Sequence, residues 1–225
     1  MCEDGVLVDV VIAGGSGQIA LRLARLLAQH DTPARGLVRS ERSSAAVRAA
    51  GARPVICDLE DLEHDVDAAI AGAEVVVFAA GSGPGSGPER KHTMDYLGAL
   101  RLLWAARRIG VARYVMISAI QAAAPPAGES DYAVYLRAKA AADEALSRDV
   151  VPFTIVRPGW LTDDPGTGHI EVGPALDHEG RISRADVAAV LLAVIDAPQA
   201  AGCTFDVLAG STPIAQAIAG LRPGW

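Results

Sequence analysis

Short apolar runs recur along the chain, and each is followed by an alanine-rich or amphipathic segment. Several runs are apolar at successive rather than alternate positions, which is typical of β-strands that are covered on both faces. We therefore expect strands at residues 10–13, 34–38, 54–57, 75–80, 114–117 and 153–156.

The segments between these runs show the spacing of helices. Apolar residues at positions 19, 23, 26 and 27 make one stripe. Further helices are predicted at 65–71, 89–109 and 131–147, and the first two of these end before Gly72 and Gly110. A glycine just past the last turn closes many helices. Strands that alternate with helices predict an α/β fold, with a doubly wound parallel sheet and helices on both faces.

A chain of 225 residues is long enough for one substantial core. We expect a single domain over residues 1–225, because little chain follows the sixth run. Residues 159–225 would contribute substrate-side loops and the last helices. The small substrate region as a whole would be built from the loops at 81–90, 119–131 and 159–181. Trp160 is the expected aromatic lining, although a tryptophan there also suits a small satellite core.

The first predicted strand leads into a glycine-rich loop with the pattern G-x-x-G-x-x-A. Small residues at such positions allow a tight turn, a close approach of the backbone to a pyrophosphate, and close packing of the next helix. The amino end of that helix offers free N–H groups to phosphate. This order indicates a Rossmann-type dinucleotide site, although a glycine turn without a ligand has the same composition. The candidate cofactor-binding residues are Gly14, Gly15, Ser16, Gly17, Gln18 and Ile19.

The end of the second predicted strand carries a cation where an NAD site carries an acid. Arg39 stands at this position, with Ser40 and Arg42 close by as further donors. A guanidinium can bind a phosphate through two hydrogen bonds, so we expect NADP rather than NAD. The alternative is a solvated surface arginine, since Glu41 dilutes the local positive charge.

Two other strand ends are expected beside the cofactor, because the carboxyl ends of parallel strands meet at one edge of the sheet. Asp58 and Leu59 follow the third strand and would border the adenine. After the fourth strand, the small residues Ala79, Ala80 and Gly81 leave room for the cofactor to lie against the backbone.

Tyr135 and Lys139 lie four residues apart in the helix predicted at 131–147, so their side chains share one face. The spacing alone is common and also fits an ordinary helix. A phenol has a pKa of about 10, so a neighbouring ammonium is needed to make it useful near neutral pH. The glycine loop earlier in the same chain is what makes the pair a catalytic candidate.

Together these motifs resemble the atypical short-chain dehydrogenase/reductases, in the branch with an extended-type glycine loop. The chain is similar to the NAD(P)H-binding group of NmrA-like proteins, biliverdin/flavin-type reductases and NAD-dependent epimerases or dehydratases. The resemblance covers almost the whole chain. It is carried by residues 14–20, 39, 58–59, 95–106, 114–118, 135–139, 154–159, 162–168 and 182–186.

The resemblance implies roles for individual residues. Tyr135 would exchange the substrate proton, and Lys139 would hold the nicotinamide ribose and lower the tyrosine pKa. Ser118 would polarise the substrate carbonyl, and Pro158 would lie on the cofactor side.

Two positions depart from the family pattern. Asp95 stands where the family has asparagine, so it is a catalytic candidate that either accepts a different hydrogen bond or marks a lost activity. Ala119 follows Ser118, where many relatives carry a second hydroxyl residue.

The formal net charge of −7, without a Lys/Arg-rich tract, argues against nucleic acid or an anionic membrane as a partner. The three cysteines and five histidines are scattered and show no metal-ligand spacing, so no metal is expected. The chain shows neither a membrane-length apolar run nor a signal-peptide pattern. We expect a cytoplasmic protein with a small-molecule substrate; its oligomeric state stays open.

Two functions fit these features. The first is an NADP(H)-dependent oxidoreductase or epimerase that acts on a small carbonyl, quinone or flavin-like compound. The second is a non-catalytic, NmrA-like protein that senses the redox state of NADP through a partner. Asp95 and the lack of a separate substrate domain favour the second.

Overall fold

The computed structural model describes residues 8–83, 85–222 and 224–225. Its strands are β1 (Val10–Ala13), β2 (Ala34–Val38), β3 (Arg53–Ile56), β4 (Val75–Phe78), β5 (Arg113–Ile117), β6 (Phe153–Pro158), β7 (Trp160–Thr162), β8 (His169–Gly173), β9 (Arg181–Ser183), β10 (Cys203–Ala209) and β11 (Thr212–Pro213). β7 and β9 form a two-stranded parallel sheet. The others form a nine-stranded sheet in the order β11-β8-β10-β6-β5-β4-β1-β2-β3.

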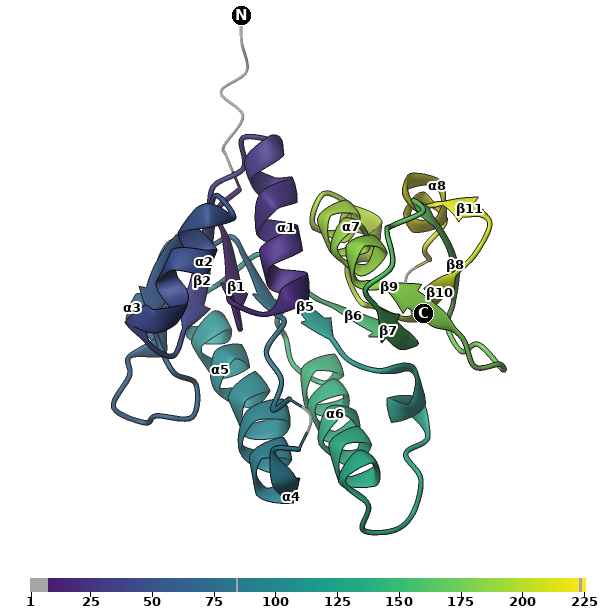
Figure 1. The fold of residues 1–225 in the computed structure, drawn as a ribbon, viewed down its shortest axis with the longest axis horizontal. Coiled ribbons are helices and arrows are strands. Elements are labelled where there is room, and N and C mark those ends of the chain that lie inside the picture. The colour runs from purple at the N-terminus through teal and green to yellow at the C-terminus, as the bar shows by residue number, and fades with distance from the viewer. Residues whose placement is uncertain (1–7, 84, 223) are drawn as a thin grey trace, which may run out of the picture.

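Helices cover both faces of the large sheet (Figure 1). One face packs against α1 (Gln18–Gln29), α2 (Ser44–Ala49), α7 (Arg184–Ile195) and α8 (Ile214–Ala219). The other face packs against α3 (Val66–Ile70), α5 (Ala99–Ile109) and α6 (Asp131–Ser147). The short elements are η1 (Glu41–Ser43), α4 (Gly87–Arg90), η2 (Lys91–Gly98), η3 (Ile120–Ala123) and η4 (Pro198–Ala200). The predicted α/β, doubly wound class is confirmed.

The six predicted strands are confirmed, and β1 and β2 have the predicted bounds. The predicted parallel sheet is confirmed, and at one edge it continues into an antiparallel strand, because β8 runs antiparallel to both β10 and β11. β8 mixes exposed and buried residues, so it lacks the continuous apolar run of a strand covered on both faces. From β3 to β10 the neighbouring strands are parallel.

The segment predicted as one helix at 89–109 consists of three consecutive pieces, α4, η2 and α5. Gly110 ends α5 in the left-handed conformation, as the sequence predicts. η2 is a π-helix, a geometry that inserts an extra residue into each turn and often marks a functional position. It buries Lys91, Met94 and Asp95 beside α6.

The first helix fixes the glycine loop against the sheet. α1 buries Ala20, Leu23, Ala24 and Leu27, which repeat at helical spacing, and it packs beside α7. At the start of the loop, a Cβ on Gly15 would lie 2.6 Å from the Cα of Gly36 in β2. A larger residue would therefore push the loop away from the sheet. No helix in the described ranges is long and apolar enough to cross a bilayer.

Candidate functional site

The glycine loop leaves the amino end of α1 open to a ligand. Gly14 has φ +73°, and a Cβ at this position would lie 2.6 Å from the Cα of Ala80 in the neighbouring strand end. Gly17 is the N-cap of α1; it makes no side-chain cap, and the first turn contains no acidic residue. The unsatisfied N–H groups and the helix dipole there favour an anion.

A cavity of about 300 Å³ lies between this loop and the ends of the neighbouring strands; we call it the glycine-loop cavity. Most of the residues predicted to bind the cofactor line it. These are Gly14, Ser16, Gly17, Arg39, Asp58, Leu59, Ala79, Ala80 and Gly81.

Seven predicted cofactor residues do not line this cavity, and three of them, Ile19, Lys139 and Pro158, line the neighbouring cavities described below. Gly15 packs against β2, and the backbone oxygen of Gln18 accepts a hydrogen bond from Arg22 at 3.0 Å. Ser40 and Arg42 are exposed, at the start of η1. Arg39 is therefore the basic residue of this segment that reaches the cavity wall.

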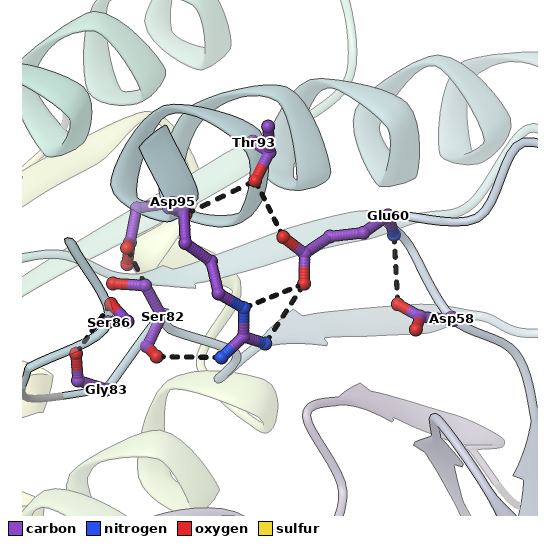
Figure 2. A network of polar contacts seen from close by, with 8 residues as sticks. Asp58, Glu60, Ser82, Gly83, Ser86, Thr93 and Asp95 are labelled. Carbon is purple, nitrogen blue, oxygen red and sulfur yellow. Dashed lines mark hydrogen bonds and ion pairs between the residues drawn. The ribbon is translucent and has the colours of Figure 1, made fainter. Parts of the chain in front are cut away.

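Arg90 is a second cation on the wall of the glycine-loop cavity, and sequence reasoning missed it. Its guanidinium donates to Glu60 at 3.0 and 3.1 Å and to the backbone oxygen of Ser82 at 3.0 Å (Figure 2). Burial opposes the charge on Glu60, but hydrogen bonds from Thr93 and Arg90 hold its pKa below the usual value. Arg90 thus links the loops on two sides of the cavity.

A larger cavity of about 530 Å³ adjoins the first and shares with it Ala79, Ala80 and Gly81; we call it the tyrosine cavity. Ile19, predicted on the cofactor side, lies on its wall. All four predicted catalytic residues also line it. They are Asp95, Ser118, Tyr135 and Lys139.

Lys139 is held by two oxygens inside this cavity. Its Nζ donates to the backbone oxygen of Ile117 at 3.1 Å and forms an ion pair with Asp95 Oδ1 at 3.4 Å. The two side chains are 4% and 0% exposed, and Asp95 Oδ2 accepts the N–H of Ser82 at 3.1 Å. Burial lowers the pKa of Lys139, but the facing Asp95, together with Tyr135 and Asp143, outweighs it, so the pKa is raised and the lysine is charged.

Tyr135 is not activated in the way that the resemblance implies. Burial raises the pKa of the phenol, Lys139 counters this only in part, and Asp95 and Asp143 raise the pKa further. The lysine is the partner of a carboxylate, so much of its effect on the phenol is cancelled. Without a bound ligand, Tyr135 is therefore a neutral proton donor at neutral pH.

A second buried acid lies behind the tyrosine cavity and escaped the sequence reasoning. Asp143 follows Lys139 by four residues, and its Oδ2 accepts from Arg157 Nε at 2.8 Å. Burial raises its pKa, while the charge of Arg157 opposes the rise. Among the described residues, neither Ser118 Oγ nor Asp143 Oδ1 has a hydrogen-bond partner. The signal for Asp143 was its place on the face that carries Tyr135 and Lys139.

A third cavity, of about 240 Å³, continues from Ser118 and Tyr135 to Trp160; we call it the tryptophan cavity. The rings of Tyr132 and Trp160 stack with centroids 5.2 Å apart, and those of Tyr132 and Tyr135 lie 6.1 Å apart. Pro158, predicted on the cofactor side, lines this tryptophan cavity and neither the glycine-loop cavity nor the tyrosine cavity. Neighbouring cavities share lining residues, so the three lie in a row from α1 to the stacked rings of Tyr132 and Trp160. We call this row the cavity path and these two rings its aromatic wall.

The described part of the chain contains no group of three or more His, Cys, Asp or Glu side chains arranged to hold a metal ion. The polar groups along the path are backbone amides, hydroxyls and charged side chains. Such a set suits an organic cofactor with a pyrophosphate.

Comparison with known proteins agrees with this reading of the site. Residues 14–198 match a family described as NAD(P)H-binding. YhfK of Bacillus subtilis (strain 168), described as an uncharacterized sugar epimerase, is 36% identical over 210 residues, which span 93% of this chain and 98% of YhfK.

Solved structures show the same fold. A Bacillus halodurans protein, described provisionally as an NAD-dependent epimerase/dehydratase, matches with a TM-score of 0.89 and 35% identity, over 94% of this chain and 98% of that one. A wide-type short-chain dehydrogenase/reductase of Veillonella parvula, solved in complex with NADP, has a TM-score of 0.71 and 18% identity, over 97% and 99% of the two chains.

Proposed function

The chain belongs to the NAD(P)H-binding family, and on that premise we propose that it is an NADP(H)-dependent oxidoreductase or epimerase of a small carbonyl, quinone or flavin-like compound. The observation that carries the proposal is the open tyrosine cavity, which places Ser118, Tyr135 and Lys139 around one space beside the glycine loop. A protein that only held a nucleotide would not need that volume to continue to an aromatic wall.

The residues of the path fit the parts of the cofactor. The amides at the start of α1 suit the pyrophosphate, and Arg39 suits a 2′-phosphate, which favours NADP over NAD. When bound, the nicotinamide supplies the hydride chemistry. Lys139 is placed to hold ribose hydroxyls, and Tyr135 holds a proton for the oxygen of a reduced carbonyl. Ser118 would hydrogen bond to the same oxygen.

The aromatic wall supports a substrate with a flat face. Trp160 is 49% exposed and stacks on Tyr132, so the two rings offer apolar surface at the far end of the path. A quinone or flavin-like ring would lie on it. An aliphatic carbonyl would use only the tyrosine cavity.

The buried ion pair between Asp95 and Lys139 favours the second candidate, a non-catalytic sensor of the NADP redox state. Burial and the charge of Asp95 raise the pKa of Tyr135 and so oppose the lowering effect of Lys139. Such a protein would bind NADP and NADPH with different affinities and would not turn over.

The test is NADPH oxidation by the purified protein with a panel of aldehydes, quinones and flavins, together with calorimetry of NADP⁺ and NADPH. If the protein is an oxidoreductase, we expect NADPH oxidation with at least one acceptor. Tight, redox-dependent binding without turnover on any acceptor would contradict the oxidoreductase and favour the sensor.

A further inference from the structure

Lysine is rare in this chain and is confined to one place. The sequence has 20 lysine and arginine residues, and only Lys91 and Lys139 are lysines. Both line the tyrosine cavity, and their side chains are 6% and 4% exposed. Lysine differs from arginine in carrying a compact ammonium with three donors that can turn toward a ligand. Lys139 has a role in the proposed function, whereas Lys91 has none.

The ammonium of Lys91 is poorly satisfied for a buried cation. Among the described residues it makes no hydrogen bond, and its one ion pair is with Asp131 Oδ2 at 3.8 Å. The Asp131 side chain is 54% exposed, so water screens this long contact. Lys139, by contrast, has a hydrogen bond to a backbone oxygen and a fully buried carboxylate partner. A buried charge without such partners is costly unless a ligand supplies them.

The surroundings indicate which ligand would do so. The tyrosine cavity also contains apolar and small residues, among them Ile19, Ala79 and Leu161. Its carboxylate Asp95 is already paired with Lys139, which leaves Lys91 as the cation able to accept a new anionic partner. An oxoanion on a ligand would replace a screened contact with direct, charge-assisted hydrogen bonds to the buried ammonium.

We propose that Lys91 binds a carboxylate on the substrate, so that the site prefers carbonyl compounds that carry a negative charge. The effect on turnover rests on the proposed function, but the binding of the carboxylate does not. Asp131 acts as the exchangeable partner of Lys91. When the substrate carboxylate binds Lys91, the ion pair with Asp131 breaks and the Asp131 side chain turns to the solvent.

The test compares benzoate with benzamide by calorimetry on the NADP⁺-loaded protein, because the two probes have similar shape and differ in charge. Benzoate should bind about 10-fold more tightly or better, as expected for a charged hydrogen bond. Lys91→Met should remove that preference and leave benzamide unchanged. Asp131→Asn should keep or strengthen benzoate binding. Arg25→Met, which removes an exposed cation of α1 that lines none of the three cavities, is the control and should change neither probe.

Two results would overturn the inference. One is failure of benzoate to bind, or equal binding of both probes. The other is an equal loss of benzoate affinity in Lys91→Met and Asp131→Asn, which would show that the ion pair only supports the fold. Thermal unfolding of each variant separates lost binding from lost folding.

A kinetic arm uses 4-carboxybenzaldehyde and its methyl ester with NADPH. A lower KM for the acid, lost in Lys91→Met, supports the inference, and equal KM values contradict it. If no aldehyde or other acceptor is reduced while benzoate binding still depends on Lys91, the proposed function fails and this inference stands.

Discussion

The two ends of the cavity path recognise their ligands by different means. At the glycine-loop end, the available groups are backbone amides and the exposed Arg39. The loop also needs glycine at positions 14 and 15, where a Cβ would clash with neighbouring backbone. At the tyrosine end, charged side chains are buried and matched, as in the pair of Lys139 with Asp95. On the proposed function, phosphate binding would depend on backbone geometry, while the chemistry would depend on pKa values set by neighbouring charges. Variants at the two ends should therefore fail in different ways.

The largest effect is expected at the tyrosine end. Tyr135→Phe removes the proton donor and should lower kcat by about 10²- to 10⁴-fold, the usual contribution of general acid catalysis. Its affinity for NADPH should remain, because the glycine-loop cavity is untouched. Tyr132→Phe, one turn earlier on α6, is the control and should keep kcat near wild type. Equal activity in Tyr135→Phe would remove this residue from the mechanism.

At the glycine-loop end, Gly14→Ala should fail through geometry. Its Cβ would lie 2.6 Å from Ala80 Cα and would require φ +73°, so we expect a loss of about 2–5 kcal/mol in the free energy of unfolding. Gly72→Ala is a matched control, since Gly72 has φ +76° but no atom lies within 4 Å of the added Cβ. It should cost about 1 kcal/mol. Chemical denaturation measures both; similar losses would show that the close contact with Ala80 is unimportant.

Arg39→Ala tests the choice of cofactor. Loss of a charged hydrogen bond should weaken NADPH by about 10- to 100-fold, and it should leave NADH almost unchanged. Arg42→Ala is the control, because Arg42 is exposed and does not line the glycine-loop cavity. Calorimetry with both nucleotides decides the matter. An equal loss for NADPH and NADH in Arg39→Ala would refute the 2′-phosphate assignment.

The smallest effect is a shift in pH dependence. Asp95 raises the pKa of Tyr135, so Asp95→Asn should lower that pKa and free the charge of Lys139 to act on the phenol. Alcohol oxidation, which needs the phenolate, should then reach its plateau at a lower pH than in the wild type. Glu144→Gln, which removes an exposed acid from the same helix, should leave the profile in place. A profile of Asp95→Asn that moves to higher pH would contradict the account.

The difference between the two ends also explains what the sequence could predict. The first strands are continuous apolar runs, and Gly14 to Ile19 follow a local pattern, so the fold and the glycine loop could be read from neighbouring residues. β10 was missed because Thr204 and Asp206 interrupt its apolar run, and Asp206 is buried all the same. The edge strand β8 has no continuous apolar run to reveal it.

The tyrosine end depends on contacts between distant elements. Asp95 and Lys139 come from η2 and α6, and the sequence does not show that they form a buried pair. The π-helix at Lys91–Gly98 has the composition of an ordinary helix, so the burial of Lys91 was not predicted. The sequence does not show that Asp143 pairs with Arg157, because Arg157 lies in β6. Charge pairing in the interior is a tertiary property.

A crystal structure with NADPH tests the central claim most directly. We predict that the pyrophosphate contacts the amides at the start of α1, with the nicotinamide in the tyrosine cavity between Ser118 and Lys139. A nucleotide bound elsewhere, or a nicotinamide held outside a tyrosine cavity that side chains have closed, would contradict it.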